Sequence, residues 1–271
     1  MGIVERLVPD ELWELFRCAA PQALVRTQGG GRRRCDDRAV LAAIVFVATT
    51  GCTWRQLPPV FGASWADRAS AFHLLVGRSG VGQAESRGPG PARCRWPGGL
   101  DAVCDRLDQR PGGQRGPLTG PNPTDRGRPG SKIHIVCDRT GLPLSIGISA
   151  ANLHDSQALI PLMRGIAPVR SRFGPRRRRP ARLHADKGYD FEHLRAWLRR
   201  RQIVPRIARR GKEPSDRLGR HRWVVERTLS WLMGCRRLHR RYERKPEHFL
   251  AFVGIASTLI CYRRSVNVDQ F

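Results

Sequence analysis

A glycine- and proline-rich stretch in the middle of the chain limits the fold more than any other feature of the sequence. Between Gly77 and Gly130, 13 glycines and 8 prolines interrupt the chain, and no helical or strand periodicity persists. Such a stretch buries too little apolar surface to offset the entropy lost on ordering. We therefore predict patterned units on either side of a segment without regular structure, and divide the chain into residues 1–63, 64–117, 118–264 and a tail, 265–271.

Residues 1–63 are predicted to form a small helical domain. Acidic residues after Pro9 open a first helix, the apolar run Arg38–Gly51 forms a second, and Thr53–Leu57 forms a short third that ends before Pro58. Three short helices with basic loops are compatible with a helix-turn-helix-like DNA-binding module. A plain helical bundle is the alternative.

Residues 118–264 alternate between strand and helix patterns. Lys132–Cys137 and Leu142–Ser149 predict a hairpin, and Arg182–Ala185 predicts a later strand that ends at Asp186. The remaining predicted elements are a strand at Ile203–Ala208 and helices at Asp155–Gly165, Phe191–Arg201, Arg220–Gly234 and Glu247–Arg264. A hairpin followed by alternating elements indicates an α/β sheet with helices on its faces.

The charge of the chain points to a polyanionic partner. The formal net charge is +26, and 45 of the 49 basic residues are arginines, whose planar forks match phosphate oxygens. GC-rich codon usage is the plain alternative. The aromatic content is only 7%, which argues against a general RNA-binding protein. The basic tracts that we expect to contact phosphate are Arg32, Arg33, Arg34, Arg176, Arg177, Arg178, Arg179, Arg199–Arg201 and Arg209-Arg210.

Cysteine usage and hydropathy predict a cytoplasmic protein without a membrane partner. The 8 cysteines are scattered without zinc or redox spacing, as expected for small buried side chains in a reducing compartment. The N-terminus has no signal-peptide pattern. No apolar run is expected to reach the length of a membrane span, and Ala39–Thr49 has the pattern of a core helix.

Two carboxylates are the candidate catalytic residues. Asp186 ends a predicted strand, where α/β sheets present ligands, and Glu226 lies in the middle of a predicted helix 40 residues later. Carboxylates in a basic protein suit divalent metal ions held against phosphate. Each residue also has a plain alternative, because Asp186 could cap a turn and Glu226 could pair with Arg222 on a solvated helix face.

Several segments resemble bacterial insertion-sequence transposases of the DDE class, in the IS five-like branch of the IS four superfamily. They are Asn122–Lys132, Ala151–Asp155, Ala185–Asp190 and Arg222–Thr228, together with Gly31–Arg34 and Gly51–Pro58 in the N-terminal region. The resemblance implies a ribonuclease-H-like catalytic domain, an Asp-Asp-Glu triad, and Mg²⁺ or Mn²⁺. It also implies DNA transposition, with cleavage of terminal inverted repeats and strand transfer into target DNA, and is compatible with a homodimer in the DNA complex.

The resemblance assigns roles to residues of the matching motifs. Asp186 matches the second acid and Glu226 the third, both as metal ligands, and Arg222 matches the arginine that precedes the third acid. Lys132 and Lys187 are expected to contact DNA. The chain departs from the family pattern at Met233, where a basic residue is common in the family. It also lacks the family's tyrosine near Arg222, since His221 stands beside that arginine.

The first acid of the triad has no obvious place in the sequence. The resemblance puts it on the first strand of the sheet, before the hairpin, and we expect that strand to be missing from residues 64–117. One hypothesis is a reading-frame shift, since codons for Cys104–Gly113, read one nucleotide later, can encode Ala-Ile-Asp-Ser-Ile-Ser-Val-Arg-Ala-Val. The alternative is that Asp105 or Asp108 supplies the acid from a loop.

These considerations predict weak or absent catalysis. Loss of the first strand would remove one metal ligand and leave backbone groups of the neighbouring strands unpaired. A catalytically inactive DNA-binding remnant of a transposase is the alternative to an active enzyme.

Overall fold

The computed structural model describes most of the chain. The described residues are 2–19, 36–62, 72, 101–108, 116–123, 125–170, 176–209, 211 and 219–268. Arg32, Arg33, Arg34 and Arg210, expected to contact DNA, lie outside them.

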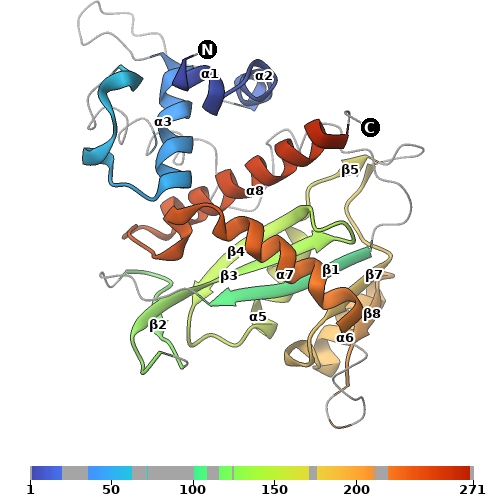
Figure 1. Ribbon diagram of the computed structural model, residues 1–271. Helices are drawn as coiled ribbons and strands as arrows, with labels where there is room; N and C mark the ends of the chain where they lie inside the picture. The colour runs from blue at the N-terminus through green and yellow to red at the C-terminus, as the bar shows by residue number, and fades with distance from the viewer. Residues whose placement is uncertain are drawn as a thin grey trace, which may run out of the picture.

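The centre of the molecule is a mixed six-stranded sheet (Figure 1). Its strands follow the order β2-β3-β1-β7-β8, and β4 pairs with β3. β1 is antiparallel to β3 and parallel to β7, which is in turn parallel to β8. The strands are β1 (Asp101–Asp108), β2 (Gly120–Pro121), β3 (Pro129–Asp138), β4 (Pro143–Ala150), β7 (Arg182–Ala185) and β8 (Val204–Ile207). A separate two-stranded ribbon joins β5 (Val169–Arg170) to β6 (Arg176–Arg177).

Helices cover both faces of this sheet, as the alternating sequence pattern predicted. α5 (Ser156–Arg164) and α6 (Glu192–Arg200) share one hydrophobic core with Ala102 and Cys104 of β1. α7 (Gly219–Met233) and α8 (Pro246–Val268) share the other core with Val103. Successive residues of β1 therefore serve opposite faces, as the pleat of a central strand requires.

The N-terminal helices join the core on the α7–α8 face. They are α1 (Ile3–Leu7), α2 (Asp10–Ala19) and α3 (Asp37–Thr50), followed by the 3₁₀ turns η1 (Trp54–Gln56) and η2 (Pro59–Phe61). The carboxylate of Asp36 accepts a hydrogen bond from the Ala39 amide at 2.9 Å and begins α3. Gly51, in the left-handed region at φ 75°, ends it.

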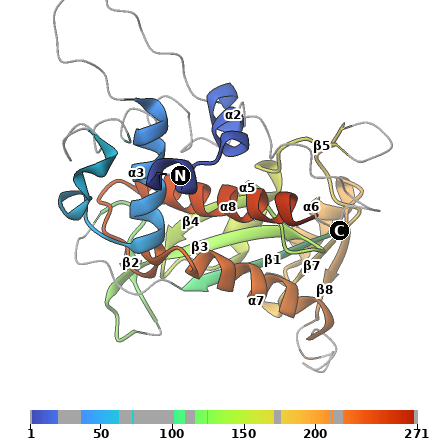
Figure 2. The same cartoon turned by 45° about the horizontal axis from the view of Figure 1, so that its top comes forward.

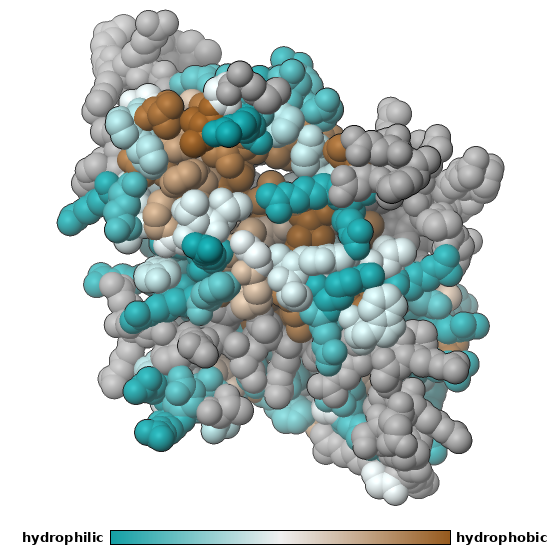
Figure 3. Space-filling view, viewed as in Figure 1, coloured by the Kyte–Doolittle hydropathy of each residue, from teal (hydrophilic) through white to brown (hydrophobic). Residues whose placement is uncertain are grey.

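α3 ties these helices to the rest of the molecule. Eight of its 14 residues are buried, and it packs against α8 and the turn η5 (Arg236–His239), in the same core as α7 (Figures 1 and 2). Figure 3 shows hydrophobic side chains gathered over the N-terminal helices on this face, among a largely hydrophilic surface.

β1 corrects the expectation that the domain lacks its first strand. This strand lies within residues 64–117 and is central, with β3 on one side and β7 on the other. Ala102, Val103 and Cys104 are 0%, 6% and 2% exposed, so the strand residues that precede Asp105 are apolar and buried, contrary to our expectation. The glycine and proline count over Gly77–Gly130 concealed this strand, because it averaged over a short run, residues 100–108, that contains neither amino acid. Its two hydrogen-bonding edges also satisfy backbone groups of β3 and β7.

α8 corrects a second expectation. By length and composition, Pro246–Val266 is long and apolar enough to cross a membrane, although we expected no run of that length. Phe249, Phe252 and Val253 lie in the hydrophobic core, and the helix packs against β4 and α3. These are the contacts of a core helix. α8 also continues to Val268, into the stretch expected to be a tail.

Candidate active site

The parallel register of β1 and β7 brings two acidic positions together. Cys104 is the partner of Ala185, and the next residues along the two strands are Asp105 and Asp186. Asp186 is exposed and begins the 3₁₀ turn η3 (Lys187–Tyr189), accepting a hydrogen bond from the Lys187 amide at 2.5 Å. The backbone positions of Asp105 and Asp186 therefore lie in neighbouring strands at the same level of the sheet.

Asp108 occupies a different place from Asp105. It lies three residues further along β1, opposite Lys132 of β3 and beyond the paired stretch of β7. Asp105 and Asp108 were both considered from the sequence. Only Asp105 comes directly after Cys104, the last residue of β1 that pairs with β7.

Glu226 lies on α7, the helix that packs against β1. The helix packs on the sheet through Val224 and Val225, which are buried in the same core as Val103. Glu226 itself is exposed on the helix. Arg222 lies one turn earlier on α7.

Two hydrogen bonds directly after Glu226 attach α7 to the β3–β4 turn. The Thr228 hydroxyl lies 2.7 Å from the carbonyl oxygen of Gly141 and 2.9 Å from that of Val224. Arg227 donates from Nη2 to the carbonyl oxygen of Thr140 at 2.7 Å. The turn requires glycine, because Gly141 has φ 86° and a Cβ there would lie 2.8 Å from Thr228 Oγ1.

Asp138 holds the same turn from inside. Its Oδ1 accepts hydrogen bonds from the Thr140 amide at 2.8 Å and the Leu142 amide at 2.7 Å, and the Thr140 hydroxyl also donates to the carboxylate. Burial raises the pKa of the Asp138 carboxyl, while the hydrogen bonds from Thr140 and Leu142 oppose that rise. The sequence predicted a turn at Asp138–Gly141 but gave it no part in the site. The signal was the Asp-x-x-Gly spacing together with the Thr that follows Glu226-Arg227.

Aromatic rings enclose Arg227. Its guanidinium carbon lies 4.5 Å from the centre of the Trp223 ring and 4.8 Å from that of Trp231. The guanidinium carbon of Arg264 lies 4.2 Å from the centre of the same Trp231 ring. Trp223 is 51% exposed. These cation–π contacts hold the Arg227 side chain along the surface of α7.

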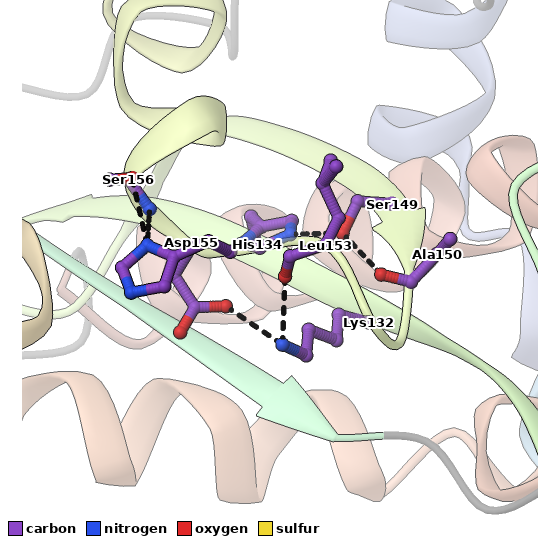
Figure 4. Close-up of polar contacts among 8 residues, drawn as sticks. Lys132, His134, Ser149, Ala150, Leu153, Asp155 and Ser156 are labelled. Carbon is purple, nitrogen blue, oxygen red and sulfur yellow. Dashed lines mark hydrogen bonds and ion pairs between the residues drawn. The ribbon is translucent and has the colours of Figure 1, made fainter. Parts of the chain in front are cut away.

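The structure places Lys132, which we expected to contact DNA, in a buried ion pair. Its ammonium donates to the carbonyl oxygen of Leu153 at 3.0 Å and lies 3.2 Å from Asp155 Oδ1 (Figure 4). Both side chains of this ion pair are buried, at 8% and 9% exposure. A buried ammonium needs a partner of opposite charge, and the Asp155 carboxylate supplies it.

Histidines of the same motifs also make structural contacts. His134 Nε2 is hydrogen-bonded to Ser149 Oγ at 2.7 Å across the β3–β4 hairpin (Figure 4). His154 Nδ1 lies 2.8 Å from Ser156 Oγ. Among the side chains that the structure describes, no three histidine, cysteine or acidic groups form a cluster for a metal ion.

The remaining basic candidates lie along the β7–β8 side of the sheet. Arg178 and Arg179 are exposed after β6, which contains Arg176 and Arg177, and Lys187 is half-buried beside Asp186. Arg179 approaches the carbonyl oxygen of Arg201, at 3.5 Å. Exposed arginines on these elements form what we call the basic edge: Arg178, Arg179, Arg182, Arg199, Arg200, Arg201 and Arg206.

Comparison with known families identifies the class of protein to which this fold and site belong. Residues 100–261, more than half of the chain, match the family model described as "Transposase DDE domain". The chain therefore belongs to the DDE transposase family, a family of enzymes that transfer phosphoryl groups on DNA. Residues 8–75 match a second model, "Putative transposase of IS4/5 family".

Relatives place the chain among the transposases of bacterial insertion sequences. It is 46% identical over 164 residues to the "Putative transposase for insertion sequence element IS402" of Burkholderia cepacia, covering 60% of this chain and 77% of that protein. It is 29% identical over 139 residues to the "Putative transposase for insertion sequence element IS6501" of Brucella ovis, covering 49% of this chain and 98% of that protein. The resemblance seen in the sequence motifs is confirmed.

A solved structure also matches at low similarity. The crystal structure of a pre-cleavage Mos1 transpososome aligns with 93% of this chain and 85% of that chain, at 9% identity and a TM-score of 0.24. That score is too low to carry an argument about the fold.

Proposed function

We propose that this protein cleaves the ends of an insertion sequence and joins them to target DNA, with Asp105, Asp186 and Glu226 as the metal-binding acids. The observation that carries the proposal is the register pair Cys104–Ala185, from which Asp105 and Asp186 follow on adjacent strands. The family match begins at residue 100 and so includes β1. Asp105, which we considered as an alternative supplied from a loop, thereby becomes the proposed first acid, on strand β1.

The arrangement around this pair supports a ribonuclease-H-like catalytic domain. A central strand carries the first acid position, a parallel neighbour ends at the second, and α7 packs over the same strand with the third. Alternate residues of a strand share a face, so position 105 belongs to the face of position 103, the face that α7 covers.

The donor set fits hard divalent cations. Three carboxylates offer the oxygen ligands that Mg²⁺ and Mn²⁺ prefer. Bound ions would polarise an attacking water or 3′-hydroxyl and stabilise the oxygen that leaves phosphorus. The protein holds the carboxylates on three separate elements of a packed core, and its basic side chains would orient the DNA backbone for in-line attack.

DNA is the proposed partner, both as terminal inverted repeats and as target. The support is the net charge of +26 together with the exposed arginines of the basic edge. We assign the N-terminal helices to DNA binding, because residues 8–75 match a transposase family model. A homodimer in the DNA complex and a cytoplasmic, nucleoid-associated location belong to the same proposal.

A catalytically inactive DNA-binding remnant is the second candidate function. Neither family model matches residues 76–99, in the segment where we predicted a reading-frame shift. That shift stays a prediction, and the nucleotide sequence of the gene tests it. The expectation of weak catalysis rested on a missing strand. Because β1 is present in the sheet, that reason no longer applies.

The deciding experiment measures cleavage and strand transfer on DNA that carries the terminal repeats, with Mg²⁺ or Mn²⁺. We expect Asp105→Asn, Asp186→Asn and Glu226→Gln each to reduce cleavage by about a thousandfold or more while DNA binding persists. Asp108→Asn is the matched control and should stay within about threefold of the unmodified protein. Binding without cleavage by the unmodified protein would favour the remnant, and full activity of Asp105→Asn would exclude that residue.

A further inference from the structure

The attachment of α7 to the β3–β4 turn has a directional character that the hydrophobic core lacks. Val224, Val225 and Leu229 pack against the sheet, but apolar contacts are non-directional and allow a helix to slide or turn slightly. The hydrogen bonds from Arg227 and Thr228 end on fixed carbonyl oxygens. They therefore determine the position of α7 along and around its axis.

Thr228 is the buried member of this attachment. It is 0% exposed, and its hydroxyl faces the Gly141 carbonyl across the interface and the Val224 carbonyl within the helix. A hydroxyl has one proton to donate, and the contact with Gly141 is the one that joins two elements. The tight approach depends on Gly141, since a side chain there would meet Thr228 Oγ1 at 2.8 Å.

Arg227 supplies a second attachment about 100° around the helix. The Trp223 and Trp231 rings, one turn before and one turn after, enclose its guanidinium, so the group is held in place when it donates to Thr140. Both acceptor carbonyls belong to the turn that the Asp138 carboxylate organises. A continuous set of contacts thus runs from the end of β3 to the residues directly after Glu226.

We propose that Thr228, assisted by Arg227, is a positioning residue that sets the place of the Glu226 carboxylate relative to Asp105 and Asp186. The inference rests on the proposed role of Glu226 as a metal-binding acid. Metal-binding groups must be held within about 0.5 Å of their productive geometry. Losing a group that orients a ligand typically costs about 10- to 100-fold in metal affinity.

The test compares Thr228→Val with Thr228→Ser. Valine keeps the shape and removes the hydroxyl, while serine keeps the hydroxyl. Thr258→Val is the matched control, because the Thr258 hydroxyl donates to the carbonyl of Gly254 on its own helix, at 2.9 Å. For each protein, Mn²⁺ binding is measured directly by titration, and the Mn²⁺ concentration for half-maximal DNA cleavage is measured separately.

We expect Thr228→Val to raise both Mn²⁺ midpoints, that of binding and that of cleavage, by about tenfold or more. Thr228→Ser should keep both within about threefold of the unmodified protein. Thr258→Val should match the unmodified protein. Unchanged Mn²⁺ midpoints in folded Thr228→Val, even with lower thermal stability, would overturn the inference. Should that variant not fold, Arg227→Lys replaces it, since lysine keeps the charge but not the planar stacking, and the same outcomes apply.

Glu226→Gln separates this inference from the proposed function. If Glu226→Gln weakens Mn²⁺ binding but Thr228→Val does not, only the positioning role fails. If Glu226→Gln binds Mn²⁺ as tightly as the unmodified protein, the metal-binding role of Glu226 fails, and the positioning role fails with it.

Discussion

Cys104 of β1 and Ala185 of β7 are register partners in a parallel pair, and both are buried in the same hydrophobic core. This pair is the last before Asp105 and Asp186, so the geometry of the candidate site depends on it. A shift of one residue in the pairing would move every side chain of β1 to the other face of the sheet. The register is therefore the relationship to test first.

The register can be trapped with a single substitution. Neighbouring strands lie about 4.8 Å apart, and disulfides form when Cα atoms are about 4.4–6.8 Å apart. We expect Ala185→Cys to form a disulfide with the natural Cys104 on oxidation, identified by peptide mapping under non-reducing conditions. Leu183→Cys is the control, because Leu183 pairs with Ala102. Equal cross-linking of both variants, or none of either, would contradict the register.

The Lys132–Asp155 ion pair makes a prediction about stability. Both groups are buried, and removal of one partner from a buried pair leaves an uncompensated charge that costs about 3–5 kcal/mol. We expect Lys132→Met to lower the free energy of unfolding by about that amount. Lys132→Met combined with Asp155→Leu should lose much less, because both charges are then absent.

Urea denaturation of the single and double variants provides the measurement, as a double-mutant cycle. Additive losses would show that the two charges do not depend on each other. DNA affinity of folded Lys132→Met should be unchanged, since the ammonium is engaged inside the protein.

The sequence predicted the elements with strong local patterns and missed those that depend on distant partners. The β3–β4 hairpin, α7 and the strand ending at Asp186 have clear periodicity or turn signals, and the structure contains all of them. β1 has only three buried apolar residues before Asp105. Its strand state comes from hydrogen bonds to β3 and β7 on both edges, which local composition does not reveal.

The site shows the same division. Asp186 and Glu226 were predicted from motifs, whereas the buried ion pair of Lys132 was not, because its partner Asp155 lies 23 residues away. The contacts of Thr228 with Gly141 join residues 87 positions apart. Contacts between residues so far apart depend on how α7 packs on the sheet, so a single sequence does not predict them.

Asp138 predicts a specific pH dependence of stability. Burial raises the pKa of its carboxyl above the ordinary value of 3.8, so the folded state binds this proton more tightly than the unfolded state. Well below pH 3.8 both states are protonated and the group has no effect. As the pH rises from there through the raised pKa, the folded protein loses stability relative to the unfolded chain.

Asp138→Asn removes this titration. We expect the difference in unfolding free energy, variant minus unmodified protein, to increase with pH across that window and then to level off. Urea denaturation at a series of pH values measures it. If the unfolding free energies of the two proteins change with pH in parallel, burial does not raise the pKa of the Asp138 carboxyl, and the prediction fails.

The basic edge makes a prediction about DNA binding. If Arg178 and Arg179 contact phosphates, each releases about 0.9 counterions per contact on a DNA duplex. We expect the double substitution Arg178→Gln with Arg179→Gln to reduce the slope of log affinity against log salt concentration by about 2. The weakening should be similar for terminal-repeat and unrelated DNA, since phosphate contacts carry no sequence information. Arg164→Gln, an exposed arginine of α5, serves as the control, and a slope for the double variant equal to that of the control would place the DNA elsewhere on the protein.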